Sequence, residues 1–237
     1  KEALDCYSKF DRTVCVSDTV KDDFESIFDT KKSVEVLYNT NESEKIKKLS
    51  DEKVDDVNFS KDIINIISVA KIVPSKGYDR LMKIHKKLIE ENIKNHIYIL
   101  GIGEEKEKYE KYLTENNLTD TFTFLGYRDN PYKYVKKADL YVCSSRREGF
   151  STAVTEALIV GTPVVSTNCS GAYELLGENN EYGIVTENNE DALYEGIKKM
   201  LTTPDLLEAY AVKAKERGKA FSTEKTVKAV EEMLENL

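Results

Sequence analysis

The chain has 237 residues, of which 40% are hydrophobic and 33% charged, and its formal net charge at pH 7 is -8. This length suits one large domain or one domain with a fragment of another, and the composition excludes a disordered chain. The net negative charge argues against general nucleic-acid binding, although lysine-rich helices could contact anionic lipid headgroups locally. Apolar runs such as residues 63–70 are far shorter than a membrane-spanning helix, so we expect a soluble protein.

The cysteine spacing bears on the cellular compartment. The four cysteines, Cys6, Cys15, Cys143 and Cys169, form no Cys-x-x-Cys motif. Cys143 also falls within a predicted buried strand. We therefore expect reduced thiols in a cytoplasmic protein.

The first part of the chain predicts a β-α-β unit, with strands at residues 12–17 and 34–39 around a helix at residues 19–28. Residues 41–61 are charged and nearly without apolar periodicity. Such a composition is typical of a connection between domains, and we place this linker at residues 46–61.

From residue 63 onward, predicted strands alternate with predicted helices. The strands are expected at residues 63–70, 96–101, 122–126, 140–145, 163–167 and 183–186. The helices are expected at residues 78–91, 104–116, 131–136, 151–160, 172–176, 191–202, 205–217 and 222–235. This alternation predicts an α/β fold with a doubly wound parallel sheet. We assign it to residues 62–220, followed by a carboxy-terminal helix at residues 221–237.

Several polar and glycine residues follow the carboxyl ends of these strands. They are Lys71, Lys76, Gly101, Gly103, Tyr127, Arg128, Glu148, Ser170 and Gly171. In an open α/β sheet these ends lie along one edge, which is where ligands bind. We therefore expect these residues to share one site.

The most informative segment, residues 146–158, places two carboxylates around a predicted helix start. Ser151 is suited to cap this helix and Gly161 to end it. The first amides, near Phe150 and Ser151, have no intrahelical partner and lie at the positive end of the helix dipole, where phosphate oxygens are favoured. Gly149 permits close backbone approach.

The two acids admit two interpretations. Glu156 falls among apolar residues within the helix, so its carboxylate is expected to be partly buried and to need hydrogen-bond donors, which a ribose diol would supply. Alternatively, Glu148 is a solvated loop acid beside Arg146 and Arg147, and Glu156 lies on the wet face of the helix. The residues alone leave both interpretations open.

Glu148, seven intervening residues and Glu156 resemble the Glu-x7-Glu motif of retaining, nucleotide-sugar-dependent glycosyltransferases of family 4. Further segments resemble that family in the same order. They are residues 69–79, 99–103, 124–126, 161–165 and 170–174. Together they cover roughly residues 63 to 220, which makes the resemblance more specific than any single motif.

The resemblance implies a GT-B fold, in which two Rossmann-like domains face each other. Residues 62–220 would be the donor-binding domain, and residues 1–45 the terminal piece of the amino-terminal acceptor domain. It further implies that Glu156 binds ribose hydroxyls, that Glu148 positions or stabilises the transferring sugar, and that the amides of Phe150 and Ser151 meet phosphate or sugar.

The same resemblance assigns the cationic groups. Lys71 and Lys76 would offset the diphosphate charge, and Arg128 would add to the donor site. Lys71 stands where the family usually has Arg, and Ala70 where it has Gly. Gly103 would let a turn pass near the donor, with a plain helix-start turn as the alternative.

No metal is implied, since the chain has no Asp-x-Asp motif. His85 lies on a predicted amphipathic helix and His96 at a predicted strand start, so both are expected to be structural or solvated. No cofactor is implied either. The expected co-substrate is a nucleotide-diphosphate sugar, with UDP as the expected nucleotide.

The implied activity is transfer of a hexose-type sugar to a glycan, a lipid-linked molecule or another acceptor with retention of configuration. A chain without the rest of the acceptor domain would be inactive alone, and any peripheral membrane contact would fall to that missing domain. Two alternatives stay open: a non-catalytic module that binds nucleotide sugars, and an epimerase or phosphorylase on the same scaffold.

Overall fold

The computed structural model describes residues 6–7, 9–28 and 34–236. Its centre is one sheet of six parallel strands in the order β5-β4-β3-β6-β7-β8. The strands are β3 (Ile64–Val69), β4 (Asn95–Leu100), β5 (Phe122–Gly126), β6 (Leu140–Cys143), β7 (Val164–Thr167) and β8 (Ile184–Thr186). The predicted doubly wound parallel sheet is confirmed.

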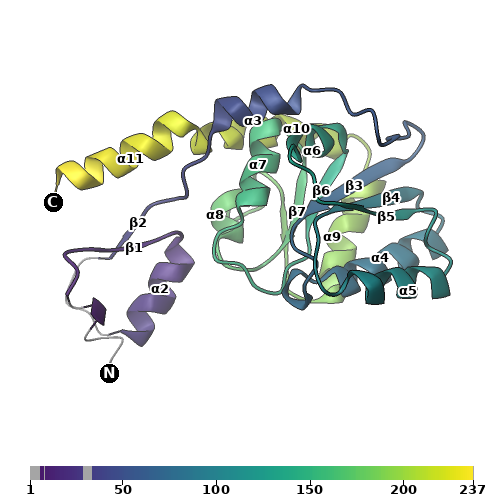
Figure 1. The fold of residues 1–237 in the computed structure, drawn as a ribbon, viewed down its shortest axis with the longest axis horizontal. Helices are drawn as coiled ribbons and strands as arrows, with labels where there is room; N and C mark the ends of the chain where they lie inside the picture. The colour runs from purple at the N-terminus through teal and green to yellow at the C-terminus, as the bar shows by residue number, and fades with distance from the viewer. Residues whose placement is uncertain (1–5, 8, 29–33, 237) are drawn as a thin grey trace.

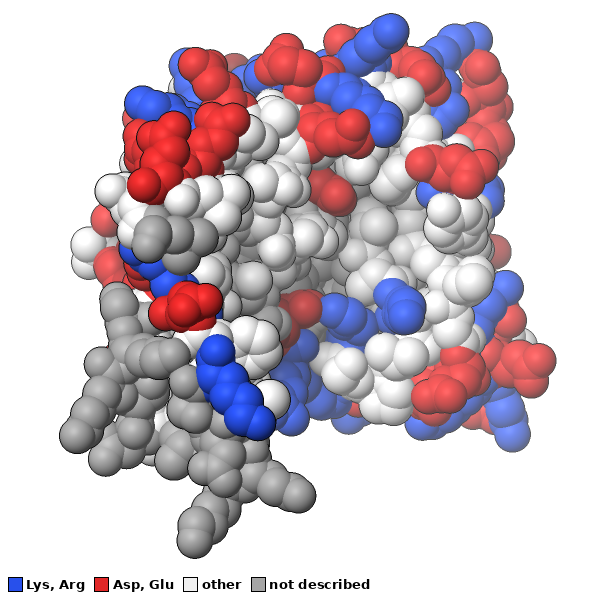
Figure 2. Space-filling model, turned by 60° about the vertical axis from the view of Figure 1, so that its left-hand side comes forward, with Lys and Arg blue, Asp and Glu red and all other residues white. Residues whose placement is uncertain are grey.

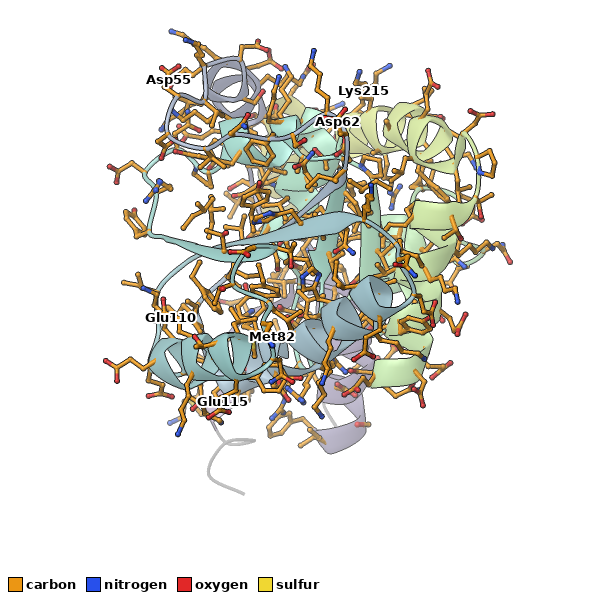
Figure 3. The ribbon with its side chains drawn as sticks, turned by 90° about the vertical axis from the view of Figure 1, so that its right-hand side faces the viewer. Asp55, Asp62, Met82, Glu110, Glu115 and Lys215 are labelled. Atoms are coloured by element: carbon orange, nitrogen blue, oxygen red, sulfur yellow. The ribbon has the colours of Figure 1, made fainter. Side chains whose placement is uncertain are left out.

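Helices cover both faces of this sheet (Figure 1). One face carries α4 (Tyr78–Glu90), α5 (Lys106–Glu115) and α9 (Glu190–Thr202). The other carries α3 (Ser43–Ser50), α6 (Tyr132–Lys137), α7 (Thr152–Val160) and α10 (Leu206–Gly218). Figure 3 shows the two layers, with Met82 of α4 on the opposite side of the sheet from Asp62. Each layer encloses its own hydrophobic core against the strands.

Helix α7 begins and ends where the sequence predicts. The Ser151 hydroxyl accepts a hydrogen bond from the amide of Val154, and Gly161 ends the helix in the left-handed region at φ 83°. Between these ends most side chains are buried, because α7 packs on the sheet and also contacts α3, α6 and α10. Glu156 is the only acid within the helix.

Helix α3 lies partly in the segment predicted to connect two domains, where the sequence analysis placed no helix. Ile46 is 3% exposed and belongs to the core formed by α6 and α7. Its neighbours Lys45 and Lys47 point outward and pair with Glu42 and Glu44. The helix has only eight residues and few apolar side chains, although its packing against α6 and α7 is extensive.

The amino-terminal unit is a small β-α-β structure beside the six-stranded sheet (Figure 1). It consists of β1 (Thr13–Cys15), α2 (Asp18–Ile27) and β2 (Val34–Val36), and its two strands are parallel. The chain leaves α10 through η2 (Lys219–Phe221), and α11 (Thr223–Glu235) then extends over this unit. The β-α-β prediction is confirmed with shorter strands.

Two short elements complete the fold: η1 (Pro74–Lys76) after β3, and α8 (Ala172–Leu176) after β7. Within the described ranges, none of the helices is long and apolar enough to cross a membrane.

Candidate functional site

The strand order reverses between β3 and β6, so the loops that follow these two strands diverge from each other. A cavity of about 280 Å³ opens at this point, and we call it the central cleft. It is lined by residues 68–71, Lys76, Tyr78, Tyr141, Cys143, Ser145, Glu148 and residues 150–153. Figure 2 shows a hollow face whose walls are largely uncharged, with a few basic and acidic side chains. The position of the central cleft, between the loops that follow β3 and β6, matches the ligand-binding crevice of open α/β sheets.

An ion pair stands in the central cleft. The Lys76 Nζ lies 2.7 Å from Glu148 Oε1, and these side chains are only 24% and 13% exposed. The Ser145 hydroxyl donates to the same carboxylate oxygen at 2.5 Å. Glu148 is therefore held in position by two donors and is not a freely solvated loop acid.

A buried arginine holds the loop that carries Glu148. Arg80 is 4% exposed and donates to the carbonyls of Ser144 and Ser145 at 2.5–2.8 Å. Its other nitrogen donates to Asn188 at 2.9 Å. These acceptors are all neutral oxygens. This arrangement fixes the end of β6 and with it Ser145.

The start of α7 forms one wall of the central cleft. Thr152 and Ala153 begin the helix and line the cavity, so their amides lack helical partners there. Phe150 also lines the cavity, and its ring stacks on Tyr38 at 4.9 Å between centroids. Gly149 lies just outside, and its carbonyl faces the Ser17 hydroxyl at 3.5 Å. The predicted helix terminus thus faces the same space as Lys76 and Glu148.

A second cavity of about 460 Å³, which we call the side cleft, adjoins the central cleft along residues 69–71. Leu100, Ile102, Tyr127, Pro131 and Tyr132 give it a mainly apolar lining. Lys71 lines both cavities, and its side chain has no ion-pair or hydrogen-bond partner within the described part of the chain. Its ammonium is therefore available to an anionic ligand at the junction of the two clefts.

Glu156 lies beside the side cleft and does not line the central cleft. It forms a hydrogen bond with Tyr132, which lines the side cleft. Burial raises the pKa of Glu156 to about 7, although the Tyr132 hydroxyl lowers it. The partly buried carboxylate expected from its apolar neighbours is confirmed. Glu148 lines the central cleft, whereas Glu156 lines neither cleft and approaches the side cleft only through Tyr132.

Two predicted site residues have other contacts in this structure. Gly103 lines neither cleft; its absent side chain makes room for the carbonyl of Ile72, which would lie 2.1 Å from an added Cβ. Arg128 lines the side cleft, but its guanidinium binds Asp56 at 3.1 Å and the Tyr134 hydroxyl at 3.3 Å. Tyr134 is only six residues away, but Asp56 lies 72 residues earlier in the chain, so the motif around Arg128 gave no sign of this ion pair.

Both histidines are structural, as expected. The His85 ring bonds Asn95 and Thr121 at 2.8 Å, and burial lowers its pKa to about 4. His96 stacks on Tyr98 and bonds Thr123. No group of three or more His, Cys, Asp or Glu side chains within the described ranges could hold a metal ion.

The sequence reasoning missed Ser145, Arg80 and Tyr132. Ser145 is the last residue of the strand predicted at residues 140–145, so its position on the binding edge could have been inferred. Arg80 and Tyr132 lie on helices, and nothing in their local sequence indicates that they hold the Glu148 loop or Glu156. Their contacts join residues many positions apart.

The fold and the cleft define an open α/β protein whose carboxyl edge presents lysines, a helix terminus and two acids to an anionic ligand. Residues 50–217 match the family described as glycosyl transferases group 1, and the chain belongs to this family.

Two relatives and two solved structures illustrate the likeness. The N-acetylgalactosamine-N,N'-diacetylbacillosaminyl-diphospho-undecaprenol 4-alpha-N-acetylgalactosaminyltransferase of Campylobacter jejuni is 34% identical over 192 residues, covering 80% of this chain and 50% of the relative. An uncharacterized glycosyltransferase of Methanocaldococcus jannaschii is 30% identical over 230 residues, covering 84% of this chain and 56% of the relative. The chain thus spans about half the length of these relatives.

Among solved structures, sucrose-phosphate synthase from Thermosynechococcus elongatus superposes with a TM-score of 0.80 at 18% identity, covering 95% of this chain and 58% of the other. HepE of Anabaena, solved in complex with UDP and glucose, gives a TM-score of 0.80 at 18% identity, covering 99% of this chain and 66% of HepE. These likenesses show the fold, which is that of the GT-B glycosyltransferases.

Proposed function

We propose that this chain is the donor-binding half of a retaining glycosyltransferase of family 4. In the whole protein it would move a hexose-type sugar from a UDP-linked donor to a glycan or lipid-linked acceptor. The Campylobacter jejuni relative, which is named as an N-acetylgalactosaminyltransferase acting on a diphospho-undecaprenol-linked sugar, supports this acceptor class. The Anabaena neighbour, solved with UDP and glucose, supports the donor class.

The observation that carries this proposal is the Lys76–Glu148 pair, which faces the first amides of α7 in the cleft between β3 and β6. A diphosphate is favoured there because lysine and free amides both stabilise phosphate oxygens. Lys71, which lines both clefts, would hold it from the other side. The nucleoside would then extend into the apolar side cleft, with its ribose hydroxyls donating to Glu156.

In this arrangement Lys76 has two successive partners. In this structure it neutralises Glu148. A bound diphosphate, with its greater negative charge, would draw the ammonium away and would gain further charge as the sugar departs. Glu148, still held by Ser145, would then face the transferring sugar, whose oxocarbenium-like transition state a carboxylate stabilises. The chain's own cations offset the leaving-group charge, and the donor is a co-substrate, with no cofactor in the proposal.

UDP titration by calorimetry tests the donor site. We expect the parent to bind UDP and Lys76→Met to bind it roughly 10-fold more weakly, because a charge-assisted contact is lost. Lys83→Met is the matched control, since Lys83 lies on α4 and pairs with Glu190 outside both clefts. A parent that fails to bind UDP at millimolar concentration would refute the proposal.

Retention requires a separate measurement on the whole protein with its acceptor domain. The anomeric configuration of the first product, followed by NMR during the reaction, should match that of the donor. An inverted product, or a product without a new glycosidic bond, would contradict the assignment to a retaining transferase.

A further inference from the structure

Lys76 and Glu148 come from two different loops, and their 2.7 Å contact requires that these loops be held together. Lys76 is the last residue of η1, which follows β3, whereas Glu148 lies in the loop that follows β6. A 3-10 turn of three residues has little stability of its own, because its hydrogen bonds are few and poorly aligned. The placement of Lys76 therefore depends on contacts from outside the turn.

The backbone of the loop after β6 packs directly against η1. An added Cβ on Gly77, which ends the turn at φ 70°, would lie 2.1 Å from the carbonyl of Ser144. The Ser144 hydroxyl donates to the carbonyl of Lys76 at 2.8 Å. The amide of Arg146 donates to the carbonyl of Ser75 at 2.7 Å. Two hydrogen bonds thus join η1 to the loop after β6.

The Arg146 guanidinium spans the whole turn. One of its nitrogens donates to the carbonyl of Pro74, the first residue of η1, at 2.8 Å. The same nitrogen and its neighbour donate to the two carboxylate oxygens of Asp79, in the first turn of α4, at 2.7 Å each. Arg146 therefore fixes the chain on both sides of Lys76.

The geometry of the Arg146–Asp79 pair sets it apart from an ordinary surface ion pair. Exposed pairs usually contribute little, and these side chains are 44% and 38% exposed. This pair is bidentate, however, which is the arrangement in which the arginine fork matches a carboxylate best. The carbonyl of Arg146 also accepts from the Asn188 side chain at 3.0 Å, and that side chain accepts from Arg80 at 2.9 Å. The backbone of Arg146 is thus held independently of η1.

We propose that Arg146 and Asp79 are positioning residues of the donor site, which keep Lys76 in place at the central cleft. Neither residue lines the central cleft or the side cleft, so they would act on the donor through Lys76 and not by contact. A cation placed in advance stabilises phosphate charge without the cost of ordering a flexible side chain. The effect on donor binding rests on the proposed function, whereas the hold on Lys76 does not.

The placement of Lys76 can be measured without a ligand. An ammonium held in an ion pair exchanges its protons with water slowly, so it gives its own signal in heteronuclear NMR of isotope-labelled protein, and Lys76→Met assigns this signal. We expect the signal in the parent and in Glu190→Gln, the matched control, which breaks the Lys83–Glu190 ion pair of the same helix α4. We expect it to broaden or vanish in Asp79→Asn. A parent without this signal, or a signal unchanged in Asp79→Asn, would overturn the proposal.

UDP calorimetry separates positioning from simple electrostatics. Removing the negative charge of Asp79 would, on charge alone, strengthen the binding of an anionic ligand, whereas a lost hold on Lys76 weakens it. We expect Asp79→Asn and Arg146→Met to bind UDP roughly 5-fold more weakly than the parent, and Glu190→Gln to bind it as the parent does. In a Lys76→Met background, Asp79→Asn should have no further effect, because residues that act through one contact are not additive.

The two measurements fail in different ways. Unchanged or tighter UDP binding by Asp79→Asn would overturn the link to donor binding, as would an equal loss in the presence and absence of Lys76. A parent that does not bind UDP would refute the donor site alone, because the Lys76 signal is recorded without any ligand. Both changed side chains are partly exposed, so the variants should stay folded, and Arg146→Met tests the same pair from its other member.

Discussion

Glu156 should make the protein less stable at neutral and alkaline pH, and replacing it with glutamine should reveal this. Burial raises its pKa to about 7, whereas in the unfolded chain the pKa is near 4.5. Between these values the folded protein keeps a proton that the unfolded chain releases. The stability that this proton contributes is complete below the unfolded pKa and is lost as the pH rises through about 7.

The size of the change in unfolding free energy follows from the shift in the pKa of Glu156. At about 1.36 kcal/mol for each pKa unit, moving from 4.5 to about 7 corresponds to a loss of about 3 kcal/mol, which is an upper bound because the side chain is not fully buried. Glutamine carries no charge and can still accept the Tyr132 hydrogen bond. Glu156→Gln should therefore raise the free energy of unfolding by up to about 3 kcal/mol near pH 8 and change it little near pH 4.

The same substitution should weaken the donor site. A charged acceptor for the ribose hydroxyls is lost, which costs about 1.5–3 kcal/mol, or roughly 10-fold or more in UDP affinity. Stability and binding thus move in opposite directions, as expected of a residue kept for function at the expense of folding. A simple structural role would not produce this combination.

Urea unfolding at several pH values and UDP calorimetry measure the two effects. Glu195→Gln is the matched control, since Glu195 is an exposed acid within α9 and should affect neither quantity. If Glu156→Gln retained the parent's pH dependence of unfolding, the raised pKa would be wrong. If it bound UDP as the parent does, the ribose role would be wrong.

The remaining predictions concern pH, backbone and loop positions. UDP affinity of the parent should fall as the pH drops below about 7, where Glu156 becomes protonated, and titrations of Glu156→Gln should lack this fall. Gly101→Ala should lower the free energy of unfolding by more than about 2 kcal/mol in urea melts, because an added Cβ would lie 1.9 Å from the carbonyl of Ala70. Unchanged stability would show that this carbonyl can move aside without cost. Arg80→Met should cost about 3 kcal/mol in the same assay, since the buried Ser144 carbonyl loses its side-chain donor and the Ser145 carbonyl keeps only the Thr167 hydroxyl. A loss below about 1 kcal/mol would show that water replaces the guanidinium. Ser17→Ala should cost about 1 kcal/mol by removing the cap of α2, and an unchanged melt would show that this cap is dispensable.

Local features of the chain were predicted well because their causes are local. The alternation of apolar strands with amphipathic helices is enough to predict the parallel sheet, and every predicted strand from residue 63 onward lies within two residues of an observed one. Ser151 and Gly161 set the limits of α7 by capping, which depends on neighbouring residues alone. From strand ends and this helix start, the sequence also predicts that Lys71, Lys76 and Glu148 share one edge.

The side-chain pairings within the site could not be predicted, because they join segments far apart. Glu156 interacts with Tyr132 from α6, and it does not line the central cleft with Glu148. Arg128 is engaged by Asp56 from the segment before β3. Gly103 follows a family-like pattern, yet its role in this fold is to admit the carbonyl of Ile72. A motif identifies the edge of the sheet that carries the candidate site, whereas the packing of the helices determines which acidic and basic side chains form ion pairs there.

The contacts between the amino-terminal unit and the main sheet fall on the same loops that shape the central cleft. The Ser17 hydroxyl meets the carbonyl of Gly149 and the hydroxyl of Ser170, and Glu174 accepts from the first amides of α2 at 3.0 and 3.3 Å. Tyr38 stacks on Phe150, which lines the cleft. Any movement of the amino-terminal unit must therefore shift the loops after β6 and β7 or break these contacts. The start of α7 and the turn after β7 are thus coupled to the placement of that unit.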